Sequence, residues 1–313
     1  MYDVIIIGAG PAGLTAAIYT LRARLKALII ESPSIMSQAG YAAFVENFPG
    51  FSQGVSGTQL LSDLKAQAAS LGAELISGDV NGVESLKQKT QNVWQVNTTE
   101  KHYPALSIIA ASGTSVRKLG ISGEDKFLGK GLSYCAICDG AFFKEKEIAV
   151  IGGGDAAVEE AIFLTRFASK VTIVHRRDRL RATRLLQERA LSDKKIDISW
   201  SSIVDKILGE NKVSGLRLKN SDTNILTELR CEGVFVSIGA IPNTGFLKNT
   251  VGLNDGGYIT TDRELKASEK GIFACGDCRD TYLKQIVTAC GDGALAAYSC
   301  QQYIDQLKGT VYN

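Results

Sequence analysis

The sequence contains little histidine and no long apolar run. Only 2 histidines occur among 313 residues. This scarcity disfavours a hydrolase built around histidine and a histidine-rich metal site. The first apolar run, residues 4–7, is ended by glycines too early for a signal peptide or a membrane span. The sequence therefore predicts no membrane segment and, by default, a cytoplasmic protein.

An excess of charge of one sign and a dense cysteine framework are also absent. The 35 basic and 33 acidic residues leave a net charge of +2, and 22% of the residues are charged. This ordinary soluble composition predicts neither a disordered tail nor a nucleic-acid partner. The 7 cysteines are odd in number and widely spread, which favours a reducing compartment over a secreted disulfide scaffold. At roughly 150 residues per domain, the length predicts two domains.

Glycine, by contrast, is abundant, with 32 residues, and it marks a strand, turn and helix pattern near the N-terminus. A β-branched run at residues 3–7 precedes the turn, and a helix-like run at residues 14–25 follows it. The turn consists of Gly8, Ala9, Gly10, Pro11, Ala12 and Gly13. A second predicted strand, residues 27–30, ends at Glu31, which follows Gly8 by 23 residues. This spacing is typical of an acid that binds a ribose hydroxyl in a dinucleotide site.

The same pattern recurs in the middle of the chain. A strand-like run at residues 147–151 leads into a glycine turn, and a helix-like run at residues 158–167 and a strand at residues 171–174 follow. This turn consists of Gly152, Gly153, Gly154, Asp155, Ala156 and Ala157. His175 ends the strand and follows Gly152 by 23 residues. Two complete units at matched spacing are much stronger evidence for dinucleotide binding than one glycine motif alone.

In each of the two units, the second strand ends at a charged segment, and the two segments differ in sign. This difference predicts a different dinucleotide for each unit. Glu31 accepts hydrogen bonds from a free ribose diol, which indicates FAD in the first site. A basic set suits a 2′-phosphate through charge-assisted contacts, which indicates NADPH in the second site. That set is His175, Arg176, Arg177 and Arg181. Ala157, in place of the third glycine, also favours NADP. A solvated basic face or a nucleic-acid patch is the plainer alternative.

Two turns that follow strand-like runs, at residues 112–114 and 239–243, mark candidate domain boundaries. We expect residues 1–114 and 245–313 to form an FAD-binding domain. Residues 115–244 would form an inserted dinucleotide-binding domain. The predicted fold class is α/β, with two Rossmann-like three-layer domains, the second inserted in the first.

A Cys-x-x-Cys pair, Cys135 and Cys138, lies within the predicted inserted domain. This spacing suits a redox disulfide that opens and closes a short ring. Half of a zinc site and a purely structural thiol pair are the alternatives. The one rival pair, Cys275 and Cys278, falls in a turn that is expected to contact flavin, which disfavours both zinc and a second redox pair. We therefore predict no metal.

Over its whole length the sequence resembles the low-molecular-weight thioredoxin reductases. The motifs that carry the resemblance are residues 8–13, 45–50, 135–140, 152–161, 175–182 and 271–277. The resemblance implies a flavin-linked disulfide oxidoreductase and a homodimer. Electrons would pass from NADPH to FAD, then to the Cys135/Cys138 pair, and finally to the disulfide of a thioredoxin-like protein.

The resemblance also implies roles for individual residues. Asp277 would bind the ribityl chain, and Gln285 would approach the isoalloxazine ring. Other contacts to FAD would come from Gln38, Asn47, Gly276, Lys284 and Ile286. Cys138 would face the flavin, and Cys135 would attack the partner disulfide. Asp139 would serve the thiols as acid and base, with a simple turn or N-cap carboxylate as the alternative.

The chain departs from the family pattern around the flavin. The usual Gly-Gly-Gln-Leu is Met36, Ser37, Gln38 and Ala39 here, and the usual Arg-Gln-Ala is Lys284, Gln285 and Ile286. Related branches take electrons from ferredoxin or hold a second FAD at the nicotinamide position. The basic set argues against ferredoxin but leaves a second FAD open as an alternative to NADPH. A flavin NADP reductase and a regulatory protein without turnover are more distant alternatives.

Three further aromatic residues lie near expected functional regions. Phe142 and Phe143 follow the cysteine motif, where an apolar lip for a partner protein and ordinary core packing are both open interpretations. Tyr312 is expected in a frayed terminus.

Overall fold

The computed structural model describes residues 1–42, 44–87 and 92–310 and divides the chain into two compact units. One unit is Met1–Ser115 with Ile241–Asn313, and the other is Val116–Ala240. Where the chain passes between them, β7 (Thr114–Val116) and β16 (Ala240–Pro242) pair as a small sheet. The chain thus returns to the first unit at Ile241, a few residues before the boundary that we expected between residues 244 and 245. Tyr312 lies outside the described residues.

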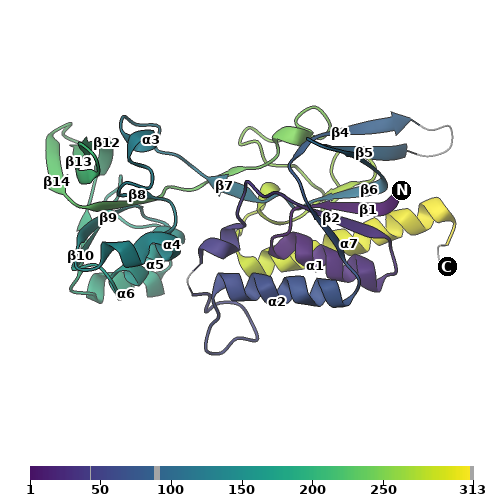
Figure 1. Ribbon diagram of the computed structural model, residues 1–313, viewed down its shortest axis with the longest axis horizontal. Helices are drawn as coiled ribbons and strands as arrows, with labels where there is room; N and C mark the ends of the chain where they lie inside the picture. Colours follow the sequence, from purple (N-terminus) through teal and green to yellow (C-terminus); the bar gives the residue numbers. More distant parts are fainter. Residues whose placement is uncertain (43, 88–91, 311–313) are drawn as a thin grey trace. The chain divides into compact units, whose positions relative to one another are not determined.

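The first unit is built on a sheet with a parallel core and an antiparallel edge (Figure 1). Its parallel strands are β3 (Glu74–Ser77), β2 (Ala27–Glu31), β1 (Tyr2–Ile7), β6 (His102–Ala110) and β17 (Ile272–Ala274). The antiparallel strands β5 (Asn92–Thr98) and β4 (Val80–Lys87) extend it beyond β6. Along β1, Val4 and Ile6 are buried in one core cluster, and Ile5 and Ile7 are buried in another. The strand is a continuous apolar run because both faces of a parallel sheet are covered.

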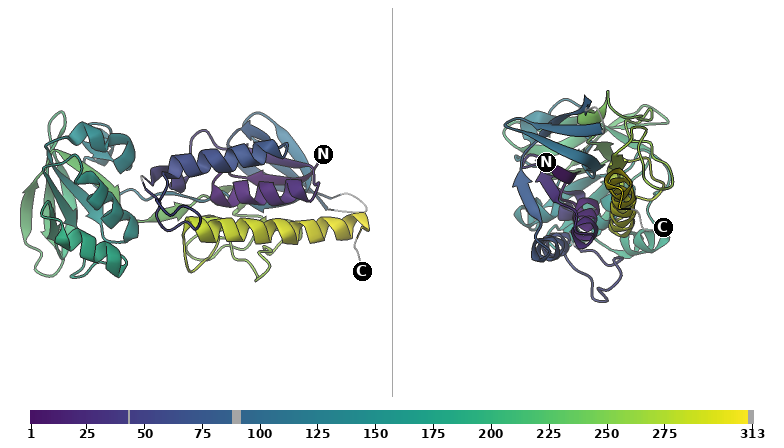
Figure 2. Two further views of the ribbon diagram at one scale, coloured as in Figure 1. Left: turned by 90° about the horizontal axis from the view of Figure 1, so that it is seen from below. Right: turned by 90° about the vertical axis from the view of Figure 1, so that its right-hand side faces the viewer.

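Helices α1 (Pro11–Arg22), α2 (Gly57–Ser70) and α7 (Ile286–Lys308) cover one face of this sheet (Figure 2). Small residues bring α1 and α7 close together. A Cβ placed on Gly293 of α7 would lie 2.2 Å from the carbonyl oxygen of Ala12 in α1. Ala296, Ala297 and Ala16 are buried in the same cluster. The two backbones therefore approach too closely at this crossing for a larger residue at position 293.

The second unit repeats this layered arrangement around another parallel sheet. The sheet order is β11 (Ile196–Ser199), β10 (Lys170–Val174), β9 (Glu147–Gly152), β15 (Gly233–Ser237) and β8 (Leu132–Ser133). The core on one face includes residues of α4 (Ala136–Asp139), α5 (Asp155–Leu164) and α6 (Arg184–Ser192). The core on the other face includes β12 (Ser202–Gly209) and β13 (Val213–Asn220), which pair with β14 (Leu226–Arg230) in an antiparallel sheet.

Both helices that follow the glycine turns begin three residues earlier than the sequence predicted. Helix α1 begins at Pro11 and α5 at Asp155, whereas we expected starts at 14 and 158. Extended glycines, Gly10 and Gly154, form the two N-caps. Proline at the first helical position is favourable because its fixed φ suits the helix and no N–H bond is lost there. The prediction missed this because it treated the whole glycine motif as turn.

Among the helices of the described residues, none has the length and apolar character needed to cross a membrane.

The α1 and α7 crossing generates a test with a matched control in the same helix. Gly293→Ala should lower the free energy of unfolding by about 1–3 kcal/mol, because the added methyl group overlaps the Ala12 carbonyl. A Cβ on Gly291 meets no atom within 4 Å. Gly291→Ala should therefore stabilise the protein by roughly 0.5–1 kcal/mol through helix propensity. Urea unfolding followed by tryptophan fluorescence measures both; equal stability of the two variants would contradict the packing argument.

Candidate active site

The first glycine turn joins β1 to α1 at very close backbone contact. Gly8 has φ +112°, and a Cβ there would lie 2.3 Å from the carbonyl oxygen of Ala111. A Cβ on Gly13 would lie 1.9 Å from the carbonyl oxygen of Gly8. Helix α1 has no side-chain cap and no acidic residue in its first turn. Its first N–H groups are therefore available to a pyrophosphate, as an FAD cradle requires.

The loop that contains the altered positions 36–39 lies directly beside this turn. The Ser37 hydroxyl is 3.1 Å from the place where a Cβ on Gly10 would be. Met36 packs against Gly40, and its side chain is half exposed. Gln38 Nε2 donates to the carbonyl oxygen of Thr114 (3.0 Å). This hydrogen bond ties the Gln38 side chain to β7, the strand where the chain leaves the first unit.

Glu31 ends β2, as predicted, but its carboxylate has a partner that sequence reasoning missed. Lys65 Nζ, from α2, donates to both Glu31 oxygens at 2.7 and 2.8 Å. Both side chains are partly exposed. The Glu31 carboxylate keeps further lone pairs for a ribose diol, because a carboxylate accepts about four hydrogen bonds. No motif could have identified Lys65, since it lies 34 residues away on an amphipathic helix.

The remaining predicted flavin contacts come from three distant segments of this unit. Asn47 Nδ2 donates to Gln285 Oε1 at 3.0 Å. Gln285 also caps α7, and Ile286 is the first residue of that helix. The Lys284 ammonium lies 3.5 Å from the ring centroid of Tyr258. The structure therefore joins position 47 to position 285, as the predicted site requires.

Asp277 lies in the short helix η4 (Gly276–Cys278), which follows β17. Gly276 has φ +71°, and a Cβ there would lie 2.8 Å from the Ala12 Cβ at the start of α1. The turn is thus placed against the N-terminal end of α1. Burial raises the pKa of the Asp277 carboxyl, while Lys284 opposes this shift. These residues fit an FAD that extends from the α1 turn toward Asp277.

The second glycine turn has the same close packing. Gly152 has φ +153°, and a Cβ there would lie 2.2 Å from the carbonyl oxygen of Ser237. Gly154 caps α5 without a side-chain bond, and the space around it is open except for Arg181 Nη2, 3.9 Å from its Cβ position. The Asp155 carboxylate accepts the Thr183 N–H at 2.7 Å. Asp155 and the exposed Ala156 can therefore serve a phosphate only through their backbone N–H groups.

His175 does not lie with the exposed arginines as expected. Its ring is 5% exposed and packs beneath Gly153, whose Cβ would lie 2.3 Å from Nδ1. Burial, and then the positive charges of Arg181, Arg177 and Arg176, lower its pKa. The ring is therefore neutral near pH 7 and supports the glycine turn. Its Nε2 is buried without a partner, and the guanidinium groups alone remain as exposed cations at this strand end.

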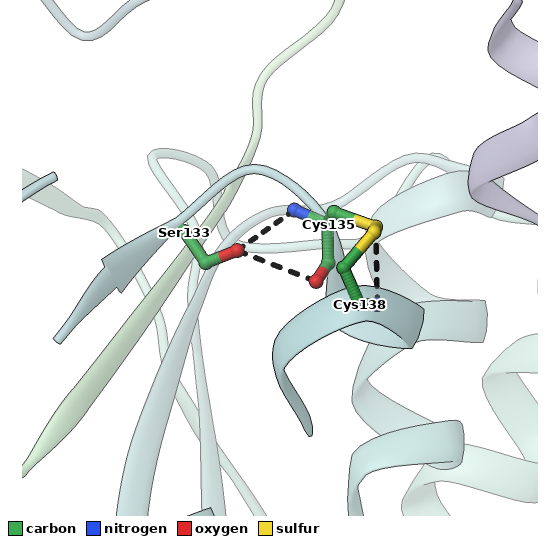
Figure 3. The surroundings of a disulfide bond; sticks show 3 residues. All are labelled: Ser133, Cys135 and Cys138. Atoms are coloured by element: carbon green, nitrogen blue, oxygen red, sulfur yellow. Dashed lines mark hydrogen bonds between the residues drawn. A yellow bond between two sulfur atoms is a disulfide. The ribbon is translucent and has the colours of Figure 1, made fainter. Parts of the chain in front are cut away.

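The predicted cysteine pair forms a disulfide in the second unit (Figure 3). Cys135 caps α4, and Ser133 Oγ accepts the Cys135 N–H at 2.9 Å. The Cys138 N–H donates to Cys135 Sγ at 3.1 Å. Cys135 is 6% exposed, whereas Cys138 is exposed to solvent. Of the two residues, Cys138 is therefore the more accessible to solvent.

Asp139 follows the disulfide at the end of α4 and is half-buried. It is the N-cap residue of the short helix η2 (Gly140–Phe143) but makes no side-chain cap bond. Asp139 therefore occupies an N-cap position, but its side chain does not make the capping bond. The two phenylalanines of η2 differ: Phe143 packs edge-on against Phe235 in the core, with centroids 5.2 Å apart, and Phe142 is 75% exposed.

A buried carboxylate that sequence reasoning missed supports the segment before Cys135. Glu124 accepts the N–H groups of Leu119 and Gly120 at 2.6 and 2.7 Å, and the Tyr134 hydroxyl also donates to it. Burial and this hydrogen bond raise the pKa of Tyr134. The tyrosine therefore stays protonated and fixes the chain one residue before the disulfide. A single Glu at the start of a short helix, α3 (Glu124–Phe127), carries no sequence signal for this role.

The other five cysteines are free thiols. Cys231, Cys275, Cys278 and Cys300 are buried, whereas Cys290 is half-buried. Burial raises the pKa of each of these thiols. Within the described ranges, no group of three or more His, Cys, Asp or Glu is placed to hold a metal ion.

Comparison with known proteins identifies the family. A protein-family model described as pyridine nucleotide-disulphide oxidoreductase matches residues 2–293. The chain belongs to this family.

Named relatives share nearly the whole chain. The thioredoxin reductase of Listeria monocytogenes is 48% identical over 310 residues, which cover 98% of this chain and 95% of the relative. That of Bacillus subtilis is 46% identical over 312 residues, covering 99% and 97%. The crystal structure of Lactococcus lactis thioredoxin reductase is 41% identical, with a TM-score of 0.93 and coverage of 98% and 100%.

These comparisons confirm several predictions. The chain has the expected α/β fold with two Rossmann-like dinucleotide-binding domains. It is an FAD-dependent disulfide oxidoreductase, with FAD and NADPH as its cofactors. The relatives named here give no support to a second FAD in place of NADPH.

The exposed arginines of this pyridine nucleotide-disulphide oxidoreductase generate a test of cofactor choice. Arg176→Ala with Arg177→Ala should raise the KM for NADPH by about 10- to 100-fold, because charge-assisted bonds to the 2′-phosphate are lost. The KM for NADH, which lacks this phosphate, should not change. Arg184→Ala is the control, because Arg184 is exposed in the same basic segment but begins α6. Steady-state kinetics with both nucleotides measure the effect; equal losses for NADPH and NADH would contradict 2′-phosphate recognition.

Proposed function

We propose that this protein is an NADPH-dependent thioredoxin reductase that acts on the disulfide of a thioredoxin-like protein. The observation that carries the proposal is the Cys135–Cys138 disulfide, with Cys138 exposed, on a unit that also holds a glycine turn and an arginine-lined strand end. An exposed disulfide next to a nucleotide site suits electron transfer to an external protein. A flavin NADP reductase would have no use for this disulfide.

We assign the two units to the two cofactors. Residues 1–115 and 241–313 would bind FAD, and residues 116–240 would bind NADPH and carry the disulfide. The FAD would be held by the α1 turn, by Glu31, and by the Asn47 and Gln285 pair with Asp277. Bound FAD supplies the two-electron chemistry that links a nicotinamide hydride to a disulfide. The close contact of backbone at Gly8 and Gly13 supports this assignment, because a pyrophosphate needs such an approach.

We also reverse the roles of the two thiols that the resemblance implied. Cys138 is accessible to a large partner, so its thiolate would attack the partner disulfide. Cys135 is buried, and its sulfur accepts the Cys138 N–H, which stabilises negative charge on that sulfur after the disulfide opens. Asp139 adjoins Cys138 and has no capping role, which leaves its carboxylate free to exchange a proton with the thiols.

The exposed Phe142 lies four residues after Cys138 and would meet the partner protein beside the disulfide. Large exposed aromatic residues are common at the centres of protein interfaces. We propose a cytoplasmic location, because five free cysteines beside one reducible disulfide suit a reducing compartment.

We further propose a homodimer formed through α7. Val287, Leu295 and Tyr298 are all exposed apolar residues of this helix, and Gly291 lies between them in open space. Their spacing of four, four and three residues places them along one stripe of the helix. The opposite side of α7 packs against α1. An exposed apolar stripe on a long helix is typical of a subunit interface.

The thiol roles can be tested with single-cysteine variants and anaerobic stopped-flow absorbance. Cys135→Ser and Cys138→Ser should both keep rapid reduction of FAD by NADPH and lose reduction of oxidised thioredoxin. Cys135→Ser should then displace thionitrobenzoate from an activated thioredoxin cysteine at least several-fold faster than Cys138→Ser does, because only Cys138 is exposed. The colour of the released thionitrobenzoate gives the rate.

Three results would count against these assignments. Faster displacement by Cys138→Ser would restore the predicted role of Cys135. Full turnover of thioredoxin by Cys138→Ser would indicate a reductase that does not use the disulfide. A flavin that NADPH leaves oxidised, while dithiols reduce it, would favour the two-flavin alternative.

The dimer has its own test. Leu295→Glu places a charge in the α7 stripe and should convert the protein to a monomer, as measured by light scattering after gel filtration. Leu191→Glu is the control, since Leu191 is more exposed but belongs to α6 of the other unit. A dimer that persists in Leu295→Glu would mean that another surface forms it.

A further inference from the structure

Asp292 of α7 is a carboxylate that no motif marks, yet it accepts three N–H bonds from one turn. Its Oδ2 accepts the Gly276 N–H at 3.1 Å and Arg279 Nε at 2.6 Å, and its Oδ1 accepts Arg279 Nη2 at 3.0 Å. Both charged side chains are largely buried, at 15% and 17% exposed. One side chain therefore holds the residues on both sides of Asp277.

The segment so held is tightly fixed by its other neighbours too. The Cys275 N–H donates to the carbonyl oxygen of Ala110 at 2.9 Å, which ties the turn to the end of β6. The Ile259 N–H donates to the carbonyl oxygen of Cys278 at 3.0 Å. Gly276 lies so close to Ala12, at the start of α1, that a Cβ on it would be 2.8 Å from the Ala12 Cβ. The orientation of Asp277 relative to the α1 turn thus depends on these few residues.

Charge makes the arrangement more than a packing contact. Burial raises the pKa of the Asp277 carboxyl, and the negative charge of Asp292 adds to this shift, while Lys284 opposes it. Arg279 pairs with Asp292 through two nitrogens, and its Nη1 also donates to the carbonyl oxygen of Asp280 at 3.2 Å. The planar guanidinium makes these bonds in a fixed geometry that a lysine ammonium cannot reproduce. The ion pair neutralises Asp292 and leaves Asp277 as the free carboxylate of the turn.

We propose that Asp292 and Arg279 are positioning residues for FAD: they fix the turn so that the Asp277 carboxylate faces the ribityl hydroxyls. The inference rests on the FAD site proposed above. The two residues act through Asp277 and the Gly276 backbone, and neither touches the reacting atoms. Their loss should therefore weaken FAD binding and shift the flavin potential, while the overall fold is retained.

The experiment compares how much FAD holoenzyme variants release after dilution. The rise in flavin fluorescence measures this release. Asp292→Asn keeps the shape and one oxygen acceptor but loses the charge, and we expect its FAD Kd to rise about tenfold or more. Arg279→Lys keeps the charge but loses the two-nitrogen pairing, and it should show a similar loss. Asp305→Asn is the matched control, because it makes the same change near the far end of α7.

Two further readouts separate positioning from a purely structural role. In saturating FAD, all variants should match the wild type in far-UV circular dichroism, and the midpoint potential of the flavin should shift only in the Asp292 and Arg279 variants. The double variant should bind FAD no more weakly than the weaker single variant, since both changes break one arrangement. Additive losses, or a wild-type potential together with wild-type FAD retention, would overturn the proposal.

Asp277→Asn distinguishes failure of this inference from failure of the FAD site. If Asp277→Asn retains FAD like the wild type, the site assignment itself is wrong and the positioning role fails with it. If Asp277→Asn loses FAD but Asp292→Asn and Arg279→Lys do not, the site stands and the positioning role is refuted. If Asp292→Asn does not fold, Arg279→Lys alone decides the outcome by the same measurements.

Discussion

The structure depends on two places where backbone meets backbone without room for a side chain. At Gly8 and Gly13 in one unit, and at Gly152 in the other, an added Cβ would lie within about 2.3 Å of a carbonyl oxygen. This contact joins the end of a central strand, the start of a helix and the neighbouring strand at one point. Because the helix begins there, its unpaired N–H groups open toward the same edge of the sheet. Each unit thereby has a helix start with unpaired N–H groups at one corner, and in the assignment proposed above the remaining site residues select which nucleotide is held there.

In the proposed assignment, charge selects the nucleotide, and the two units carry charges of opposite sign at the end of the second strand of each glycine-turn motif. In the first, Glu31 is held by Lys65, and the turn at Asp277 is held by the Asp292 and Arg279 pair. In the second, the guanidinium groups stay in solvent while the neighbouring imidazole is buried beneath the turn. The acidic groups proposed to orient FAD are thus paired and partly buried, whereas the arginines proposed to bind the 2′-phosphate are left exposed.

Reactivity among the seven cysteines follows from location rather than from residue type. Burial raises the pKa of the free thiols and keeps them in the inert protonated form. Cys135 and Cys138 differ because a short helix places the Cys138 N–H against the Cys135 sulfur and leaves Cys138 exposed. One reducible pair can therefore coexist with five inert thiols in a single chain.

Local sequence alone determined the strands that flank the two glycine turns, both turns themselves, the α/β class and the cysteine pair, because each depends on residues close together in the chain. It placed the helix starts three residues too late, since the glycine motif does not show where its turn becomes helix. Only the tertiary structure decided which groups are buried and which distant residues meet: Lys65 with Glu31, Asn47 with Gln285, His175 beneath Gly153, and Cys138 rather than Cys135 in solvent. These contacts depend on the packing of segments up to 238 residues apart. A periodic pattern along the chain predicts which face of an element is buried, but it does not predict which distant residues meet.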